Sequence, residues 1–433
     1  MNTAKPTDTT KKMGLGMRLC QYVVSGVVLG IVCGGICLLF CFATSVCDAI
    51  GQGFRNLIFV LPAAGLLVVY LYDKKFKGLN LDTNSIYRYL HDGEPISKWQ
   101  APLIFLSTCL AYLFSGSVGR AGSAMQIGSC VAYLTGNKLG EAGSKIRIFL
   151  DLRPDMLMAC GMAAAFTSIF KSPVAGAVFG VEMLVLSRKK LDLIIPAGIT
   201  SYVTYLLGNI TAINYTDIHT LFGVEDPTNY DPVTIEFNTL WKVIVIVLCT
   251  VILARAFCVL RRLTSRWFNR YLPNPFVRVL VGTGLVIAIT LLIGHRECNG
   301  LGFETAGIAI IYGHTKPLDF LFKLVLTLLT LGCGIRGGEI SPNIFIGATF
   351  GCAAAPYLHM NPCLAASVGM IGTLSSVTNS TIAIFIMGLE LISFTPVAAF
   401  YLAVTCLITH MVSGSMCLYS GQETTSIPFK LKY

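Results

Sequence analysis

The chain has 433 residues, of which 54% are hydrophobic and 12% are charged, and its formal net charge is +10. An ordinary soluble domain has about 25% charged residues, so this composition excludes a soluble globular protein and predicts an integral membrane protein. The basic residues are dispersed at the ends of apolar segments without interleaved aromatic residues, which argues against a nucleic-acid partner.

Apolar runs recur along the whole sequence, and several approach the ~20 residues that a helix needs to span a bilayer. The first run, residues 17–42, is too long for the apolar region of a signal peptide, so we expect the first membrane helix there. Further membrane helices are predicted over residues 54–72, 240–259, 277–293, 320–331 and 397–412. We expect a cytoplasmic tail (1–16), a single membrane transport domain (17–425), a C-terminal tail (426–433) and no cytoplasmic regulatory domain.

The distribution of charge predicts the orientation, because cytoplasmic loops collect lysine and arginine. Basic residues cluster near the N-terminus and within residues 74–77, 188–190 and 255–270. Residues 207–241 carry carboxylates but no lysine or arginine. The pattern therefore predicts a cytoplasmic N-terminus and an outward-facing loop at 207–241.

Two segments that lie 208 residues apart match without a gap at seven of 24 positions. They are Gly161–Leu184 (GMAAAFTSIFKSPVAGAVFGVEML) and Gly369–Ile392 (GMIGTLSSVTNSTIAIFIMGLELI). The matches include the pair Glu182 and Glu390. This similarity predicts two structural repeats, at about residues 50–207 and 240–415.

A second pair of motifs also matches between the two halves of the chain. Gly119–Gly128 (GRAGSAMQIG) corresponds to Gly338–Gly347 (GEISPNIFIG), 219 residues further on, and each motif opens a short apolar helix. Short helices that begin at Gly, Ser or Pro clusters are predicted over residues 121–134, 173–187, 342–355 and 381–394.

The start of a helix exposes backbone N–H groups and the positive end of the helix dipole, which together attract anions. Transporters place such broken helices at corresponding positions of two repeats, near the middle of the membrane. The pattern therefore predicts a transporter or channel for a small anion. The alternative is that the glycines serve only close helix packing.

Most of the sixteen cysteines lie inside apolar runs, and Cys33, Cys37 and Cys41 share one helix face, so we interpret them as packing residues. The six histidines are scattered, and therefore no metal site and no cofactor are predicted. The sequence has no pattern typical of a paired acid and base or of an activated nucleophile, so it does not indicate an enzyme.

These motifs resemble those of the CLC family of chloride channels and chloride/proton antiporters, in the same order and over about residues 17–425. GRAGSAMQIG resembles that family's G-[KR]-E-G-P-x-x-Q-I-G, SPVAGAVFGVEM its A-P-L-A-G-x-x-F-x-x-E-E, and Cys417–Ser420 its P-L-Y-S. Residues 337–342 (GGEISP) resemble the G-G-E-[VI]-[ST]-P of the fluoride/proton antiporter branch. The resemblance implies an all-α membrane protein of inverted repeats, a homodimer in a bacterial inner membrane, and export of fluoride in exchange for protons.

The resemblance also implies a central anion site. Its donors would come from two loops and two further side chains: Gly119, Arg120, Ala121, Gly122 and Ser123; Gly338, Glu339, Ile340 and Ser341; the Tyr419 hydroxyl; and Asn80 as a weaker candidate. Fluoride is strongly hydrated, so several short N–H and O–H donors must replace its water.

Two positions depart from the family pattern. Ala121 stands where the family has its gating glutamate, and a methyl group can neither compete with the anion nor carry a proton. The resemblance therefore implies passive anion flux, with the alanine either engineered or native to an uncoupled member. Met183 stands where chloride/proton antiporters often have an inner glutamate. The alternatives are a chloride channel or chloride/proton exchanger and, more distantly, a cation-coupled small-solute transporter.

The positions of four charged side chains allow specific expectations. Because Glu182 and Glu390 match across the repeat, we expect them to cap or pair near helix ends rather than to transfer ions. The charge of Glu339 should be balanced by neighbouring backbone or by a cation such as Arg336. Arg120 should either attract anions or tie down its loop through carbonyls.

Overall fold

The computed structural model describes residues 15–77, 79, 84–141, 150–184, 188–211, 236–391, 396–413 and 418. Most of the N-terminal tail, the C-terminal tail and most of the predicted outer loop lie outside these ranges.

In the first half of the chain the helices are α1 (Leu15–Gly53), η2 (Arg55–Val60), α2 (Leu61–Val69), η3 (Tyr70–Lys75), α3 (Ser85–Asp92), α4 (Gln100–Leu113), α5 (Ala121–Glu141), α7 (Pro154–Phe170), α8 (Pro173–Glu182), η4 (Arg188–Leu193) and α9 (Ile194–Ile210). In the second half they are α11 (Phe237–Tyr271), α12 (Pro275–Ile293), α13 (Phe303–Ile311), α14 (Asp319–Gly332), α15 (Ser341–Ala354), η6 (Pro356–Leu358), α16 (Pro362–Thr378), α17 (Thr381–Leu391) and α18 (Pro396–Ser413).

The predicted all-α membrane fold is confirmed. Among the described residues, six helical stretches are long and apolar enough to cross a membrane: Gly16–Gly53, Arg55–Lys75, Leu191–Ile210, Phe237–Tyr271, Pro275–Ile293 and Pro396–Ser413. Four of them contain a predicted span, Arg55–Lys75 begins one residue after the predicted 54–72, and Leu191–Ile210 was not predicted. The sixth predicted span, residues 320–331, forms α14, which has only 14 residues and cannot cross a bilayer alone.

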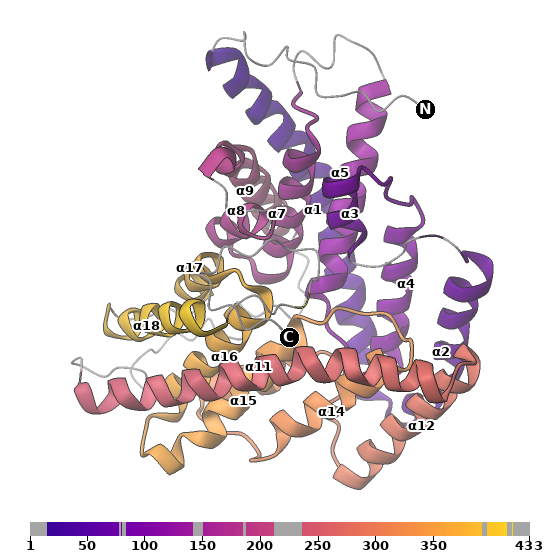
Figure 1. Cartoon of the computed structure of the whole chain (residues 1–433), viewed down its shortest axis with the longest axis vertical. Coiled ribbons are helices and arrows are strands. Elements are labelled where there is room, and N and C mark those ends of the chain that lie inside the picture. Colours follow the sequence, from indigo (N-terminus) through magenta and orange to yellow (C-terminus); the bar gives the residue numbers. More distant parts are fainter. Residues whose placement is uncertain are drawn as a thin grey trace.

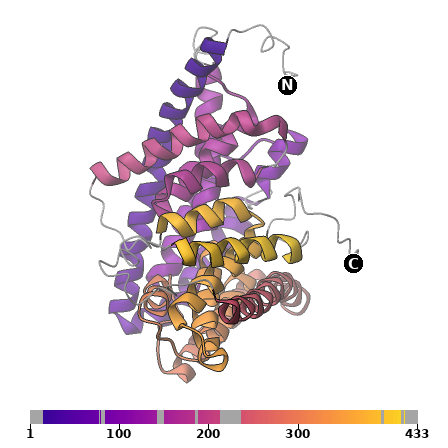
Figure 2. The same cartoon turned by 90° about the vertical axis from the view of Figure 1, so that its left-hand side faces the viewer.

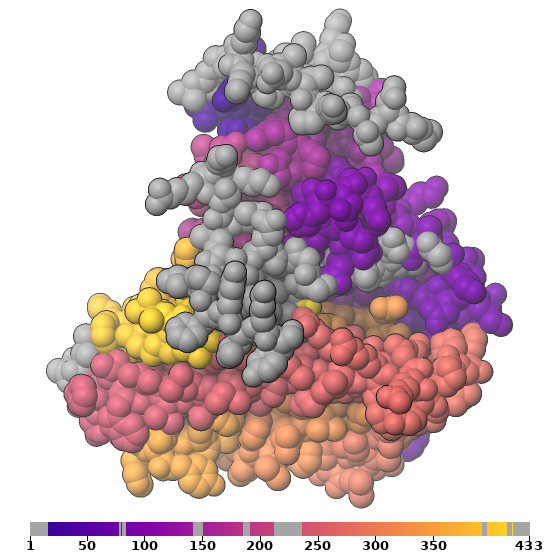
Figure 3. All heavy atoms as spheres, viewed as in Figure 1, coloured from indigo at the N-terminus to yellow at the C-terminus, as the bar shows by residue number. Residues whose placement is uncertain are grey.

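The two halves of the chain occupy different parts of the molecule. Figure 1 shows α1, α4, α5 and α7 in the upper part and α11, α12, α14 and α15 in the lower part. Where the halves meet, α8 packs against α17, and the turned view in Figure 2 shows the same order. The space-filling view in Figure 3 shows α11 as a band across the lower part of one face.

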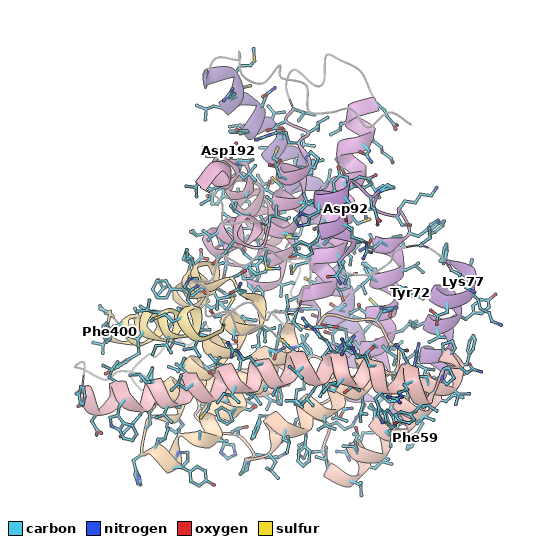
Figure 4. The ribbon with its side chains drawn as sticks, in the orientation of Figure 1. Phe59, Tyr72, Lys77, Asp92, Asp192 and Phe400 are labelled. Atoms are coloured by element: carbon cyan, nitrogen blue, oxygen red, sulfur yellow. The ribbon has the colours of Figure 1, made fainter. Side chains whose placement is uncertain are left out.

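Large apolar side chains lie on the outside of the helices, as expected for a surface in contact with lipid. Phe59 is 56% exposed and Phe400 is 38% exposed, and Figure 4 shows them near opposite edges of the molecule. By contrast, Cys33, Cys37 and Cys41 are completely buried on α1, in agreement with their predicted packing role.

The helices reproduce the predicted repeat. Both α7 and α16 have 17 residues, and their first residues lie 208 positions apart. Each ends at a residue in the left-handed region, Lys171 with φ 51° and Asn379 with φ 53°, again 208 positions apart. In addition, α1 contacts α4, α5, α7 and α9, just as α11 contacts α14, α15, α16 and α18. These equivalent contacts extend the first repeat into α1, upstream of the boundary near residue 50 that we expected.

Matched glycines hold the paired helices of each half together. A Cβ atom on Gly161 would overlap the carbonyl oxygen of Gly128, and one on Gly369 would overlap that of Gly347. The glycines that the two sequence motifs share therefore meet each other, one pair in each half. Such close contact lets the backbones of α5 and α7, and of α15 and α16, approach without side chains between them.

Glu182 and Glu390 each cap a helix in the opposite half. The Glu182 carboxylate accepts hydrogen bonds from the N–H groups of Ile382 (3.1 Å) and Ala383 (2.9 Å), at the start of α17. The Glu390 carboxylate accepts from Val174 (3.0 Å) and Ala175 (2.9 Å), at the start of α8. A carboxylate at a helix start is stabilised by the free N–H groups and by the helix dipole, so the expected structural role is confirmed.

Candidate functional site

The two glycine motifs lie side by side where the halves meet. The N–H of Gly119 donates to the carbonyl of Gly338 at 2.8 Å, and the N–H of Gly338 donates back at 2.7 Å. A Cβ atom on Gly119 would come within 2.6 Å of the Pro342 ring, and one on Gly338 within 2.8 Å of the Gly119 carbonyl oxygen. Both positions therefore require glycine, and the pairing aligns the starts of α5 and α15.

Ser341 connects the two loops through its side chain. Its hydroxyl oxygen accepts hydrogen bonds from the N–H groups of Arg120 (3.3 Å) and Ala121 (3.1 Å). A hydroxyl has two acceptor lone pairs and one proton. These two N–H groups thus occupy the lone pairs of Ser341, while its proton remains able to donate to a ligand.

Gly122 and Ser123 lie in the first turn of α5, beside this loop. The Ser123 hydroxyl accepts a hydrogen bond from Thr108 at 2.9 Å and is completely buried. Ser123 therefore links the start of α5 to α4.

A small cavity adjoins the paired loops. Residues from both halves of the chain line it: Ala121, Met125, Phe166, Ile169, Phe170, Phe179, Ile340, Thr378 and Ile384. Ala121 and Ile340 are 3% and 2% exposed and lie 219 positions apart, at corresponding places in the two motifs. Thr378 supplies the polar side chain of this lining, so the wall next to Ala121 is almost entirely apolar.

Sequence reasoning missed the aromatic part of this wall. The Phe166 ring stacks on Phe179 with centroids 4.2 Å apart and lies 4.5 Å from Phe170. Phe166 and Phe179 lie within the repeat segment Gly161–Leu184, in which the glycines and Glu182 match the second repeat. Their spacing in the sequence does not distinguish a cavity wall from ordinary helix packing.

Arg120 anchors its loop. The side chain is completely buried, donates from Nη1 to the Ser45 hydroxyl at 3.1 Å, and lies over the Phe303 ring at 5.0 Å from the centroid. Arg120 thereby ties the loop to α1 and α13. This agrees with the expectation that Arg120 ties down its loop, although its partner is the Ser45 hydroxyl and not a carbonyl.

Glu339 pairs with a different cation from the one we expected. Its carboxylate accepts from Nε of Arg261 at 2.9 Å, and both side chains are partly exposed, at 25% and 19%. Arg336 instead lies over the Tyr72 ring, 5.3 Å from its centroid. The expectation of Arg336 was wrong because α11 is longer than the predicted apolar run and carries Arg261 to this loop.

Tyr419 and Asn80, the other two predicted ligands, lie outside the described residues. Leu418 is described, and its N–H donates to the carbonyl of Val377 at 3.2 Å. This contact brings the residue before Tyr419 next to Thr378, which lines the cavity.

The chain is similar to several known proteins. The chain is 29% identical over 377 residues to the chloride/fluoride channel protein of Pseudomonas syringae pv. tomato, an alignment that covers 84% of this chain and 78% of the relative. A solved CLC-type fluoride/proton antiporter superimposes with a TM-score of 0.83 at 24% identity, covering 96% of this chain and 100% of that one. A slow cyanobacterial Cl⁻/H⁺ antiporter superimposes with a TM-score of 0.71 at 18% identity, covering 90% and 93%.

These two superpositions show a shared fold. The sequence model described as voltage gated chloride channel matches residues 63–414, which is most of the chain and includes both glycine motifs. The chain therefore belongs to the voltage-gated chloride channel, or CLC, family of membrane anion transporters.

Proposed function

We propose that the protein carries fluoride passively across a membrane, through the junction of the paired glycine loops. The observation that carries this proposal is Ala121, which places a methyl group at the start of α5 against the apolar cavity. A residue at this position could meet an anion held by the paired loops, but alanine has no proton to exchange. Anion movement would then be independent of proton movement.

Fluoride is the preferred substrate for two reasons. The loop Gly337–Pro342 resembles that of the fluoride branch, and the names of two similar proteins include fluoride. The junction also offers the proton of Ser341, whose lone pairs accept from the N–H groups of Arg120 and Ala121, as a short donor of the kind a strongly hydrated anion needs. Chloride is the alternative substrate and should be tested beside fluoride, because a Cl⁻/H⁺ antiporter has the same fold.

We also propose a homodimer in a bacterial inner membrane, with the N-terminus in the cytoplasm. Basic residues at the ends of α1, η3 and α11 support this orientation. Exposed apolar side chains on α17 and α18, such as Ile382 (49%), Leu407 (61%) and Met411 (66%), offer a surface for a second subunit.

Flux from liposomes tests the substrate and the coupling together. Protein in liposomes loaded with fluoride or chloride should release fluoride faster, without proton uptake. Ala121→Glu would place a carboxylate at the cavity, and this variant should take up protons as fluoride leaves. Its fluoride flux should rise as the pH falls, because protonation removes the negative charge that competes with the anion.

Ala121→Gln is the matched control, since it has similar size but cannot titrate. It should show neither proton uptake nor pH-dependent flux. Equal release of fluoride and chloride would refute the substrate assignment, and proton uptake by the unmodified protein would refute passive flux.

A further inference from the structure

A cluster of three potential metal ligands lies away from the glycine loops. His295 and Cys298 stand in the segment between α12 and α13, and Asp319 is the first residue of α14. Their ligand atoms, one imidazole nitrogen, one thiol sulfur and one carboxylate oxygen, all lie within 4.8 Å of one another. No metal site was expected here, because the six histidines are scattered along the sequence.

The distances fit a tetrahedral ion. With zinc bonds of about 2.0–2.3 Å, neighbouring ligand atoms should be about 3.3–3.8 Å apart. Nε2 of His295 is 3.5 Å from Oδ1 of Asp319, and Sγ of Cys298 is 3.8 Å from the same oxygen. Two of the three pairs thus already have the spacing of ligands of one small cation, and all three groups lie within 4.8 Å of one another.

The surroundings of the cluster also favour a cation. Asp319 is 1% exposed, and its second oxygen, Oδ2, has no hydrogen-bond partner among the described residues. A buried carboxylate oxygen without a partner is costly, and a cation would satisfy it. Since the His295 side chain is 22% exposed, the cluster can be reached from solvent.

A second carboxylate lies beside the histidine. Nδ1 of His295 is 3.7 Å from Oε2 of Glu297, too far for a hydrogen bond, and Nζ of Lys316 lies 2.8 Å from the same oxygen. The negative charge of Glu297 adds to the attraction for a cation, while Nε2 of His295 faces Oδ1 of Asp319.

We propose that His295, Cys298 and Asp319 form a binding site for a zinc-like transition-metal ion, with water as the fourth ligand. A thiolate, an imidazole and a carboxylate suit Zn²⁺ and exclude the oxygen-preferring Mg²⁺ and Ca²⁺. On binding, a bond forms between the metal and Sγ of Cys298, and the thiol proton passes to solvent. Affinity should therefore fall as the pH is lowered.

The site connects to the candidate anion site through one segment. The Cys298 carbonyl accepts from the Ser117 hydroxyl at 3.2 Å, two residues before Gly119. Five residues after Cys298, Phe303 lies against Arg120. A bound ion would therefore fix the segment that contacts both ends of the Gly119 loop.

Cobalt binding to the purified full-length protein tests the proposal. Co²⁺ should produce a thiolate-to-metal charge-transfer band, and Zn²⁺ should displace it. Cys298→Ser should abolish the band, whereas His295→Gln should raise the Kd at least about tenfold. Glu297→Gln should raise the Kd less than His295→Gln does, because Glu297 acts only through its charge near the cluster.

Two controls separate the site from other thiols and imidazoles. His314 and Cys249 are exposed and lie outside the cluster, so His314→Gln and Cys249→Ser should bind Co²⁺ like the unmodified protein. His295 is partly exposed, so its variant should fold and elute normally in size-exclusion chromatography even if Cys298→Ser does not. Absence of the band, or unchanged Co²⁺ affinity in folded His295→Gln, would overturn the proposal.

Discussion

Matching glycines pack the helices of the two halves, but the loops where the halves meet, residues 119–123 and 338–342, match only at Gly119 and Gly338. Gly128 contacts Gly161 in the first half just as Gly347 contacts Gly369 in the second. At the loops, Arg120 is buried over an aromatic ring, whereas Glu339, 219 positions later, is partly exposed beside Arg261. The comparison shows that the repeat supports the architecture, while the differences between the loops form the candidate site.

The asymmetry is clearest at Ser341. Its hydroxyl accepts from both N–H groups at the start of α5, but the corresponding residue of the first half is Gly122, which has no hydroxyl to return the contact. One loop thus caps the other. The Ser341 hydroxyl therefore has no counterpart at the equivalent position of the first half.

The largest effect should come from breaking a matched glycine contact. Gly369→Leu would push a side chain into the backbone of Gly347, and overpacking of this kind costs about 3 kcal/mol or more. We expect little folded protein, as measured by thermal unfolding and size-exclusion chromatography. Gly284→Leu is the control, since no heavy atom lies within 4 Å of a Cβ at that helical position. Equal stability of the two variants would contradict the repeat packing.

Removing a capping glutamate should have the next largest effect. Glu182→Ala leaves the N–H groups of Ile382 and Ala383 without their acceptor, and one or two such buried groups cost about 2–3 kcal/mol. Glu390→Ala should cost less, because the Glu390 side chain is less buried than that of Glu182, which is 9% exposed. Comparing the midpoint temperatures of the two variants checks this order, and a larger loss for Glu390→Ala would refute it.

Ser341→Ala should reduce anion flux with a smaller effect on stability. If the Ser341 proton donates to the anion, its loss should cost about 1.5 kcal/mol, or roughly tenfold in flux. Ser129→Ala is the matched control, because this buried hydroxyl on α5 has no hydrogen-bond partner among the described residues. Fluoride release from liposomes gives the measurement. Wild-type flux in Ser341→Ala would remove Ser341 from the route.

The smallest effect should come from the pair Glu339 and Arg261. Because both side chains are partly exposed, water screens their attraction, and the pair should contribute under about 1 kcal/mol. A double-mutant cycle of Glu339→Gln and Arg261→Gln, followed by thermal unfolding, measures this coupling. A coupling well above that value would show that the pair is held away from water.

The starts of the short helices could be predicted closely, since helices begin where Gly, Ser or Pro interrupts an apolar run. The structure begins α5 at Ala121, α8 at Pro173 and α17 at Thr381, as predicted. The ends were less accurate, because α5 continues to Glu141 beyond the predicted Leu134. Neighbouring helices support such an extension, and local sequence does not record them.

The sequence by itself determined the membrane class, the two repeats and the glycine loops, because hydropathy, internal similarity and helix-start residues are properties of local sequence. Only the tertiary structure decided which distant residues meet: Gly119 with Gly338, Glu339 with Arg261, and His295 with Asp319. Such contacts depend on how whole helices pack, since a shift of one helical turn would bring different side chains together. Both sources contribute at Glu182 and Glu390. Their match in the sequence predicted a shared role, and the packing of α8 on α17 determined which N–H groups they accept from.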